Sequence, residues 1–256
     1  MLFLREAGSP ADPAIVLLHG SGLSSKMWLP QIASLQQDFY LLAPDLPQQG
    51  ESWQVAPFSF EDSASQVAEI ISAKVPGGMA HVVGLSLGGA VALTLLRLAP
   101  EHIDHMIVSG TEARLGRVPG HFSLAALGWT RFRNQDQRVE SKLKQQGIPE
   151  QYRELVYFDL LRSTTKAFNR SVLQSLMDMQ LPQRASRPLL ALVGENENSR
   201  AWQAARKLVE TLPGTRGAVV AAVGHVWNLQ KPELFNQVLR AWVSNQPLPD
   251  DLKPIA

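Results

Sequence analysis

Short apolar runs alternate with helical stretches along most of this chain of 256 residues, and this alternation restricts the fold more than any other feature. The runs are rich in Val, Ile, Leu and Ala, and they cover 14–18, 40–43, 81–83, 106–108, 189–193 and 218–223. Continuous apolar runs of this length are typical of strands buried on both faces of a parallel sheet. Strands that alternate with helices predict an α/β fold with a mostly parallel sheet and helices on both faces.

The stretches between the runs carry signals of helix ends. Ser59 followed by Asp62 forms a start similar to a capping box, and apolar residues with helical spacing follow it. Further helices are predicted over 89–98, 201–212 and 232–243, each with Pro or Gly at a boundary.

One long segment has no strand-like run. From about 115 to 183 the sequence shows only helical patches, which cover 122–132, 136–146, 150–162 and 166–179. We therefore expect a helical cap over 115–184, inserted into an α/β core that consists of 1–114 and 185–256. Open α/β sheets place elements that cover a ligand at the carboxyl ends of strands.

The sequence Gly84-Leu85-Ser86-Leu87-Gly88 stands between an apolar run and an apolar helix. This is the context of a nucleophile elbow, a tight strand-to-helix turn that holds a serine hydroxyl above the sheet. Side chains two residues before and after the serine would clash in such a turn, and glycine removes the clash. A helix start beneath Ser86 favours developing negative charge. The context predicts Ser86 as a nucleophile, whereas the motif alone would indicate only a Gly/Ser turn.

Backbone amides that can hold an oxyanion are predicted at two places. His19-Gly20-Ser21-Gly22 follows the first run, and Leu87 follows the predicted nucleophile. We expect the N–H groups of Ser21 and Leu87 to face the oxygen of a tetrahedral intermediate. The alternative for residues 19–22 is a simple glycine turn after a strand.

A general base is predicted at Gly224-His225, after the last run and before the last helix. Imidazole is neutral near pH 7, as a general base must be, and a loop at the end of a late strand can reach the serine. The other histidines lie at a strand start, in exposed connections, in the insertion or in the turn at 19–22. His225 therefore fits this role best.

The acid that would orient His225 is expected after the run 189–193. Glu197 is the preferred candidate, because it lies three residues beyond the glycine that ends this run. Glu195 is a near alternative, and Glu112 is an alternative from an adjacent loop. Each could instead be a solvated loop carboxylate, which is the usual place of Glu.

The composition excludes several other classes of protein. The chain has 0 Cys, which excludes a disulfide scaffold, a thiolate zinc site and a cysteine nucleophile. A formal net charge of +1 gives no overall field for nucleic acid or an anionic membrane. No segment approaches the roughly 20 apolar residues that span a bilayer, and the start lacks the features of a signal peptide. We expect a cytoplasmic monomer or homodimer that binds neither nucleic acid nor membrane.

Together these motifs resemble the α/β-hydrolase superfamily, in its single-domain branch with a helical cap, over nearly the whole chain. The segments that are similar to its oxyanion turn, strand end, elbow and histidine loop are His19-Gly20, Ala43-Pro44-Asp45-Leu46, Val83-Gly84-Leu85-Ser86-Leu87-Gly88-Gly89, and Gly224-His225 with Pro232. Serine at 86 excludes the branches that use aspartate there. Two departures are Gln48-Gln49, where the family usually has Gly-His, and Glu197, where it usually has Asp.

The resemblance implies a serine hydrolase that cleaves a carboxylic ester, thioester or lactone through an acyl-enzyme on Ser86. It implies a triad of Ser86, His225 and Glu197, and no metal or organic cofactor. The same triad could serve carbon–carbon bond hydrolysis, acyl transfer or cofactor-free perhydrolysis. A ligand-binding receptor with a slow triad is the rival from a different class.

The near-neutral total charge conceals an uneven distribution. The segment 115–184 holds 11 Lys and Arg against 6 Asp and Glu, whereas the remainder holds 13 against 17. A basic cap over an acidic core favours an acidic acyl substrate or an acidic carrier protein, unless the cap is only a solvated helical face. Trp28 and Trp227 closely follow predicted catalytic loops, and we expect them to line an apolar acyl pocket.

Overall fold

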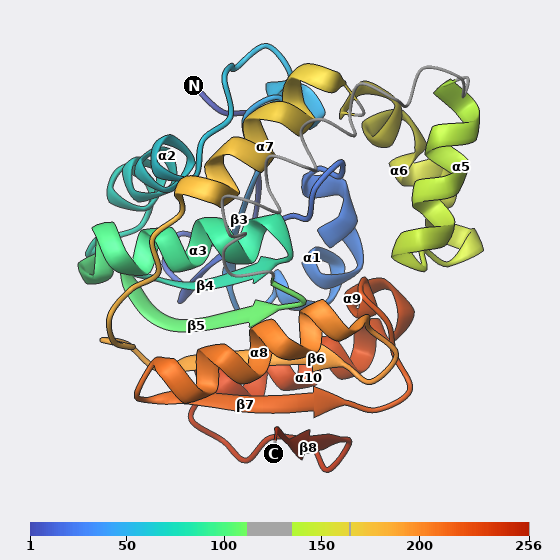
Figure 1. Cartoon of the computed structure of the whole chain (residues 1–256). Coiled ribbons are helices and arrows are strands. Elements are labelled where there is room, and N and C mark those ends of the chain that lie inside the picture. Colours follow the sequence, from blue (N-terminus) through green and yellow to red (C-terminus); the bar gives the residue numbers. More distant parts are fainter. Residues whose placement is uncertain (112–134, 164, 256) are drawn as a thin grey trace.

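The computed structural model describes residues 1–111, 135–163 and 165–255 (Figure 1). In these residues eight strands form one sheet in the order β1-β3-β2-β4-β5-β6-β7-β8. The strands are β1 (Leu4–Ala7), β2 (Ala14–Leu18), β3 (Tyr40–Pro44), β4 (Ala80–Leu85), β5 (Ile103–Ser109), β6 (Leu189–Gly194), β7 (Thr215–Val220) and β8 (Leu252–Pro254). Pairing is parallel from β3 to β7, while β1 and β8 are antiparallel at the two edges. The predicted α/β fold with a mostly parallel sheet is confirmed.

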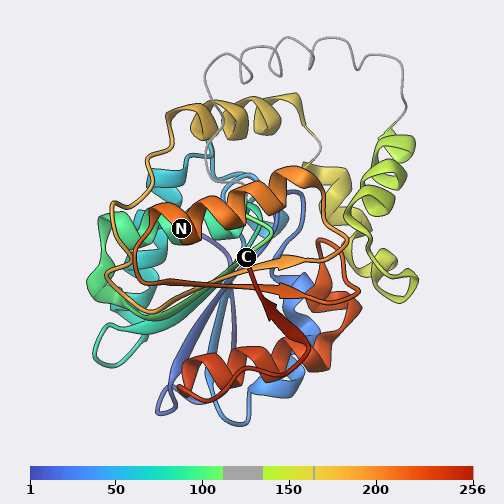
Figure 2. The same cartoon turned by 60° about the horizontal axis from the view of Figure 1, so that its bottom comes forward.

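Helices cover both faces of the sheet (Figure 2). In the described residues the α-helices are α1 (Leu29–Leu35), α2 (Phe60–Lys74), α3 (Leu87–Leu98), α5 (Gln135–Gln146), α6 (Glu150–Ser163), α7 (Lys166–Asp178), α8 (Ser199–Thr211), α9 (Trp227–Gln230) and α10 (Pro232–Val243). One core packs α2, α3 and α8 against the sheet, and the other packs α1 and α10 against its opposite face. No described helix has the length and apolar character that crossing a membrane requires.

Successive side chains of the inner strands enter opposite cores. In β2, Val16 and Leu18 join the core of α2 and α3, whereas Ile15 and Leu17 join the core of α1 and α10. A strand with apolar side chains on both faces must be covered on both faces. The continuous apolar runs of the sequence therefore explain why helices pack on each side of the sheet.

Most predicted strands and helices are confirmed, but the bounds of one strand differ and the two edge strands were not predicted. The run 218–223 was expected as one strand, but β7 begins at Thr215 and ends at Val220, and the chain turns at Ala222 with φ of 58°. The edge strands β1 and β8 were not predicted, because they are short and partly exposed and so lack an apolar run. Ser59 caps α2 as predicted, since its side chain accepts a hydrogen bond from the Asp62 amide at 3.0 Å.

In the described residues, three helices follow one another between β5 and β6, where the insertion was expected. The predicted patches at 136–146, 150–162 and 166–179 correspond to α5, α6 and α7. The patch at 122–132 and the boundary at 114/115 lie outside the described residues. The division into a core and a cap at 115–184 stays a prediction.

Candidate active site

Ser86 occupies the turn between β4 and α3 in a strained backbone conformation. Its φ is 55°, in the left-handed region that residues other than glycine seldom adopt. A Cβ placed at Gly84 would lie 2.4 Å from the carbonyl oxygen of Gly88, and one at Gly88 would lie 2.2 Å from that of Leu18. Both predicted glycine positions are therefore required by contact with backbone. The turn presents Ser86 at the carboxyl edge of the sheet, at the start of α3.

His225 and Glu197 come together from the loops that follow β7 and β6. Nδ1 of His225 lies 2.6 Å from Oε2 of Glu197, although the residues are 28 positions apart. The Glu197 side chain is 1% exposed, and its other oxygen accepts the amide N–H of Gly194 at 3.0 Å. Because a carboxylate only accepts, Nδ1 of His225 is the donor. The neutral ring then has its lone pair on Nε2, which is the arrangement a general base needs.

The two alternative acids are separated from this pair. The carboxylate of Glu195 accepts the amide N–H of Ala222 at 2.8 Å, which braces the turn after β7. Glu112 lies outside the described residues. Of the described candidates, the structure brings Glu197 to His225.

Gly110 is a residue of this site that the sequence reasoning did not single out. It follows β5 with φ of 57°, and a Cβ there would lie 2.8 Å from Nδ1 of His225 and 2.9 Å from Oε2 of Glu197. Its amide donates to the carbonyl of Leu192 at 3.1 Å. The signal in the sequence was a glycine two residues after the apolar run 106–108.

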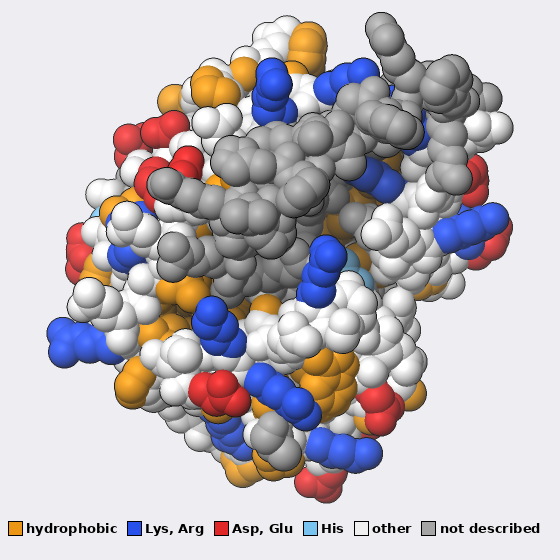
Figure 3. All heavy atoms as spheres, viewed as in Figure 1, with side chains coloured by type: hydrophobic (Ala, Val, Ile, Leu, Met, Phe, Trp, Pro, Cys, Tyr) orange, Lys and Arg blue, Asp and Glu red, His pale blue; other side chains and the backbone are white. Residues whose placement is uncertain are grey.

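A cavity of about 710 Å³ opens beside these residues at the carboxyl edge of the sheet. Ser86, His225 and Glu197 all line it, as do the predicted oxyanion residues Ser21 and Leu87. The face in Figure 3 is hollowed here, and Lys and Arg side chains flank the hollow. The structure thus places the five residues predicted for the triad and the oxyanion hole on one cavity.

The turn that holds Ser21 is fixed by two buried side chains. His19 accepts the Leu46 amide N–H on Nε2 at 2.9 Å, so its Nδ1 donates to the carbonyl of Gly20, also at 2.9 Å. Burial lowers the pKa of His19, which favours this neutral ring. Gln49, at one of the departures from the family pattern, accepts the Gly22 amide N–H at 2.7 Å.

The two tryptophans do not line this cavity. Trp28 and Trp227 are both 0% exposed, and their rings lie 5.5 Å and 4.6 Å from the ring of Phe235 in the core beneath α10. The indole N–H of Trp227 donates to Ser109 Oγ at 2.8 Å. The expectation of an acyl pocket at these residues disagrees with this placement, because both rings are buried in the core.

The helices between β5 and β6 contact the loops of the site through polar groups. Gln146, at the end of α5, donates to the carbonyl of Ser21 at 3.2 Å. Gln230 joins the histidine loop to the turn after α5, since it accepts the Gly224 amide at 2.7 Å and donates to the carbonyl of Gly147 at 2.8 Å. Asp159 of α6 is 1% exposed and accepts a hydrogen bond from the Ser24 hydroxyl.

The model of the alpha/beta hydrolase family matches residues 15–238. The chain belongs to this family. An AB hydrolase superfamily protein of Gibberella zeae is 29% identical over 96% of this chain and 86% of its own length. A pimeloyl-acyl carrier protein methyl ester esterase of Nitrosomonas europaea is 31% identical over 87% of this chain and 92% of its own.

Two further matches agree with this assignment. Carboxylesterase YbfK of Bacillus subtilis is 28% identical over 90% of this chain and 80% of its own length. An esterase of Thermogutta terrifontis has a solved structure with a TM-score of 0.80 and 22% identity, over 95% of this chain and 93% of that one. At that identity the structural match supports the fold alone. The predicted family, its fold and an enzyme of the hydrolase class are confirmed.

Proposed function

We propose that this protein hydrolyses carboxylic esters through an acyl-enzyme on Ser86. The observation that carries the proposal is the contact of 2.6 Å between His225 Nδ1 and the buried carboxylate of Glu197, on the cavity that Ser86 lines. A histidine held in this tautomer, on the same cavity as a serine in a strained turn, is the arrangement expected of a nucleophile and its base. The esterase names of the relatives from Nitrosomonas europaea and Bacillus subtilis support the same reaction.

In the first half of the reaction, Nε2 of His225 takes the proton of the Ser86 hydroxyl as Oγ attacks the ester carbonyl. Amide N–H groups of Ser21 and Leu87 hold the oxyanion that develops on the carbonyl oxygen. The imidazolium then returns the proton to the departing alcohol, and the acyl group remains on Ser86. Glu197 stabilises the imidazolium and fixes the orientation of its ring.

In the second half, His225 takes a proton from water, which attacks the acyl carbonyl of the ester on Ser86. The carbon–oxygen bond to Ser86 breaks, and the imidazolium gives its proton to the Ser86 oxygen. The products are a carboxylic acid and an alcohol. Every step uses groups of this chain and water, so the proposal needs no metal or organic cofactor.

We further propose that the substrate carries a negative charge. Lys142 of α5 lines the cavity and is only partly exposed, and burial lowers the pKa of its ammonium group. Among the described residues no carboxylate forms an ion pair with Lys142, so its ammonium group has no carboxylate partner there. A carboxylate or phosphate on the substrate would provide one.

Turnover of a short-chain p-nitrophenyl ester tests the reaction. We expect wild-type protein to release p-nitrophenol, and Ser86→Ala and His225→Ala to lower kcat by at least about a thousandfold. Turnover that survives Ser86→Ala would contradict the mechanism. A panel of thioesters, lactones and carbon–carbon substrates, with alcohols or peroxide as alternative acceptors, then separates ester hydrolysis from the other reactions of such a triad.

A further inference from the structure

Two histidines and a carboxylate lie close together where β4 and β5 begin. This is the end of the parallel strands opposite to the end that carries the cavity. His81 is the second residue of β4, and Asp104 and His105 lie near the start of β5. Ser86 follows the other end of β4, roughly 16 Å away along the strand. None of the three side chains lines the catalytic cavity, so the cluster is independent of the proposed hydrolysis.

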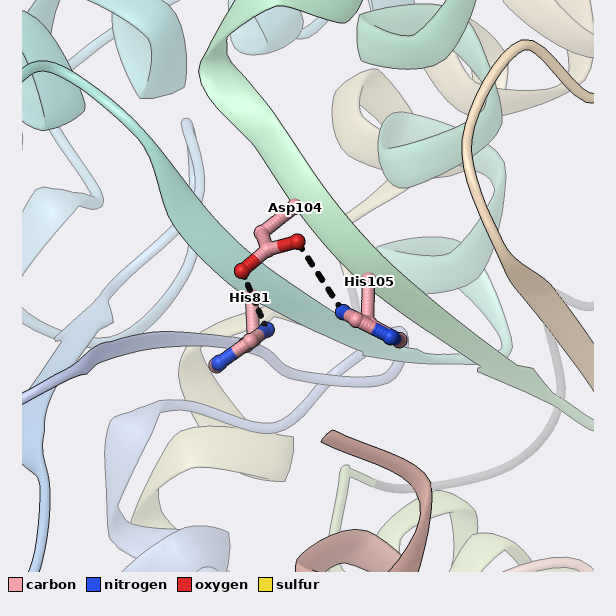
Figure 4. A group of neighbouring side chains, drawn as sticks. All are labelled: His81, Asp104 and His105. Atoms are coloured by element: carbon pink, nitrogen blue, oxygen red, sulfur yellow. Dashed lines mark hydrogen bonds and ion pairs between the residues drawn. The ribbon is translucent and has the colours of Figure 1, made fainter. Parts of the chain in front are cut away.

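An irregularity in the pairing of β4 with β5 brings these residues together. Ala80 pairs with Ile103 and Val82 with Met106, so His81 alone stands opposite the two residues Asp104 and His105. Neighbours on a regular strand point to opposite faces, whereas a bulge re-aims one of them. In Figure 4 the Asp104 carboxylate directs one oxygen toward each histidine ring.

The three side chains have donor atoms within reach of one ion. Asp104 Oδ1 lies 3.1 Å from Nδ1 of His105, and Oδ2 lies 3.7 Å from Nδ1 of His81. One ligand atom from each residue lies within 4.8 Å of the other two. His81 and His105 are 7% and 8% exposed, while the Asp104 side chain is 44% exposed. The two histidine rings are therefore packed within the protein, whereas the carboxylate of Asp104 is open to solvent.

Nδ1 of His81 is a buried polar atom without a hydrogen-bond partner in the described residues. Such atoms are rare in folded proteins, and an ion or water usually satisfies them. This nitrogen is directed at the carboxylate of Asp104 (Figure 4). A cation between the two would satisfy both groups.

Asn245, which follows α10, holds His105 from the far side of its ring. Its Oδ1 lies 3.1 Å from Nε2 of His105, while Nδ1 of the same ring lies 3.1 Å from Oδ1 of Asp104. Both oxygens only accept, so a neutral ring can donate to only one of them. With an ion on Nδ1, the ring proton would be on Nε2 and would be donated to Asn245. Metal-bound histidines commonly donate their second ring N–H to an oxygen in this way.

We propose that His81, Asp104 and His105 bind a divalent transition-metal ion of the zinc class. The ligands are Nδ1 of both histidines and a carboxylate oxygen of Asp104. Two imidazoles favour zinc, nickel or copper, whereas magnesium and calcium prefer oxygen ligands. Zinc binds four ligands at about 2.0–2.2 Å, so small side-chain rotations would close the cluster and a water would complete it. The ion would join the starts of β4 and β5 and thereby stabilise the fold.

The test titrates chelator-treated protein without a histidine tag with zinc chloride, by isothermal titration calorimetry. We expect one ion per wild-type chain, and at least tenfold weaker binding in His81→Gln and in Asp104→Asn. His102→Gln is the matched control, because His102 lies two residues from Asp104 but contacts the carbonyl of Gly78 at 2.6 Å. This control should bind zinc as the wild type does.

A second readout is thermal unfolding with and without zinc, since a ligand of the native state raises Tm. Zinc should raise the Tm of the wild type and of His102→Gln, and leave that of Asp104→Asn unchanged. Absence of stoichiometric binding by the wild type, or binding that is the same in His81→Gln and Asp104→Asn, would overturn the proposal.

Discussion

Gly110 lies so close to His225 that a Cβ at position 110 would be 2.8 Å from Nδ1 of the histidine. It would also lie 2.9 Å from Oε2 of Glu197. The glycine therefore forms the wall against which the pair is held, on the loop after the strand next to Ser86. This contact links the backbone after β5 to the orientation of the proposed base.

Replacement of Gly110 should disturb catalysis without touching a reacting group. Gly110→Ala must displace the His225 ring or the carboxylate of Glu197, and a shift near 1 Å can cost about a hundredfold in kcat. Gly77→Ala is the control, because Gly77 has a similar positive φ of 80° but no neighbour within 4 Å of the added Cβ. Ester turnover by the two variants, each checked for folding by circular dichroism, makes the comparison. Equal kcat in both variants would contradict a role of Gly110 in positioning His225 and Glu197.

The acid should be distinguishable by two matched substitutions. Glu197→Gln keeps the size of the side chain but loses the charge that stabilises the imidazolium, and we expect kcat to fall by roughly 10³–10⁴-fold. Glu195→Gln should leave kcat within about twofold, because Glu195 contacts the Ala222 amide and not His225. Steady-state kinetics on one p-nitrophenyl ester measures both. A large loss in Glu195→Gln alone would reverse the assignment.

Lys142 should discriminate between charged and neutral esters. Lys142→Met is expected to lower kcat/KM about tenfold for the mono-p-nitrophenyl ester of a dicarboxylic acid, because the ion pair in the cavity is lost. The neutral ester of equal chain length should be unaffected or improved. Lys207→Met makes the same change of net charge on exposed surface, away from the cavity, and serves as the control. Equal losses for both esters would contradict recognition of a charge by Lys142.

The buried His19 should make stability depend on pH. Its folded-state pKa lies below the ordinary value of 6.5, because burial outweighs the attraction of Asp45. Below about pH 6.5 the unfolded chain binds a proton that folded His19 does not, so stability falls as pH decreases, by at most about 1.4 kcal/mol per pH unit. Urea unfolding of wild type and His19→Asn between pH 8 and 5.5 measures this. The variant should lose stability less steeply, and identical slopes would contradict the assignment.

The sequence was sufficient to predict the parts of the site whose residue types are required by the local backbone geometry. Glycines at 84 and 88 are required by backbone contacts within the elbow and with Leu18, so the motif predicts the turn on its own. The order of strands then brings loops after β4, β6 and β7 to one edge, which is why His225 and Glu197 could be predicted together.

Other features depend on packing between distant segments, and the sequence did not predict them. Trp28 and Trp227 stand near the predicted loops in sequence, but their rings turn into the core against Phe235. The role of Gly110 is apparent only when the ring of His225 is in place. The cluster of His81 with Asp104 depends on a bulge, which no periodicity in the sequence indicates.

The most direct test of the central claim is the intact mass of the protein after treatment with a fluorophosphonate. Wild-type protein should gain one phosphonyl group, and peptide mapping should place it on Ser86, because only an activated serine attacks this reagent. Ser86→Ala should gain none, and Glu197→Gln should react much more slowly. Labelling of Ser86→Ala at the wild-type rate, or a wild-type label at another residue, would contradict the assignment of Ser86 as the nucleophile.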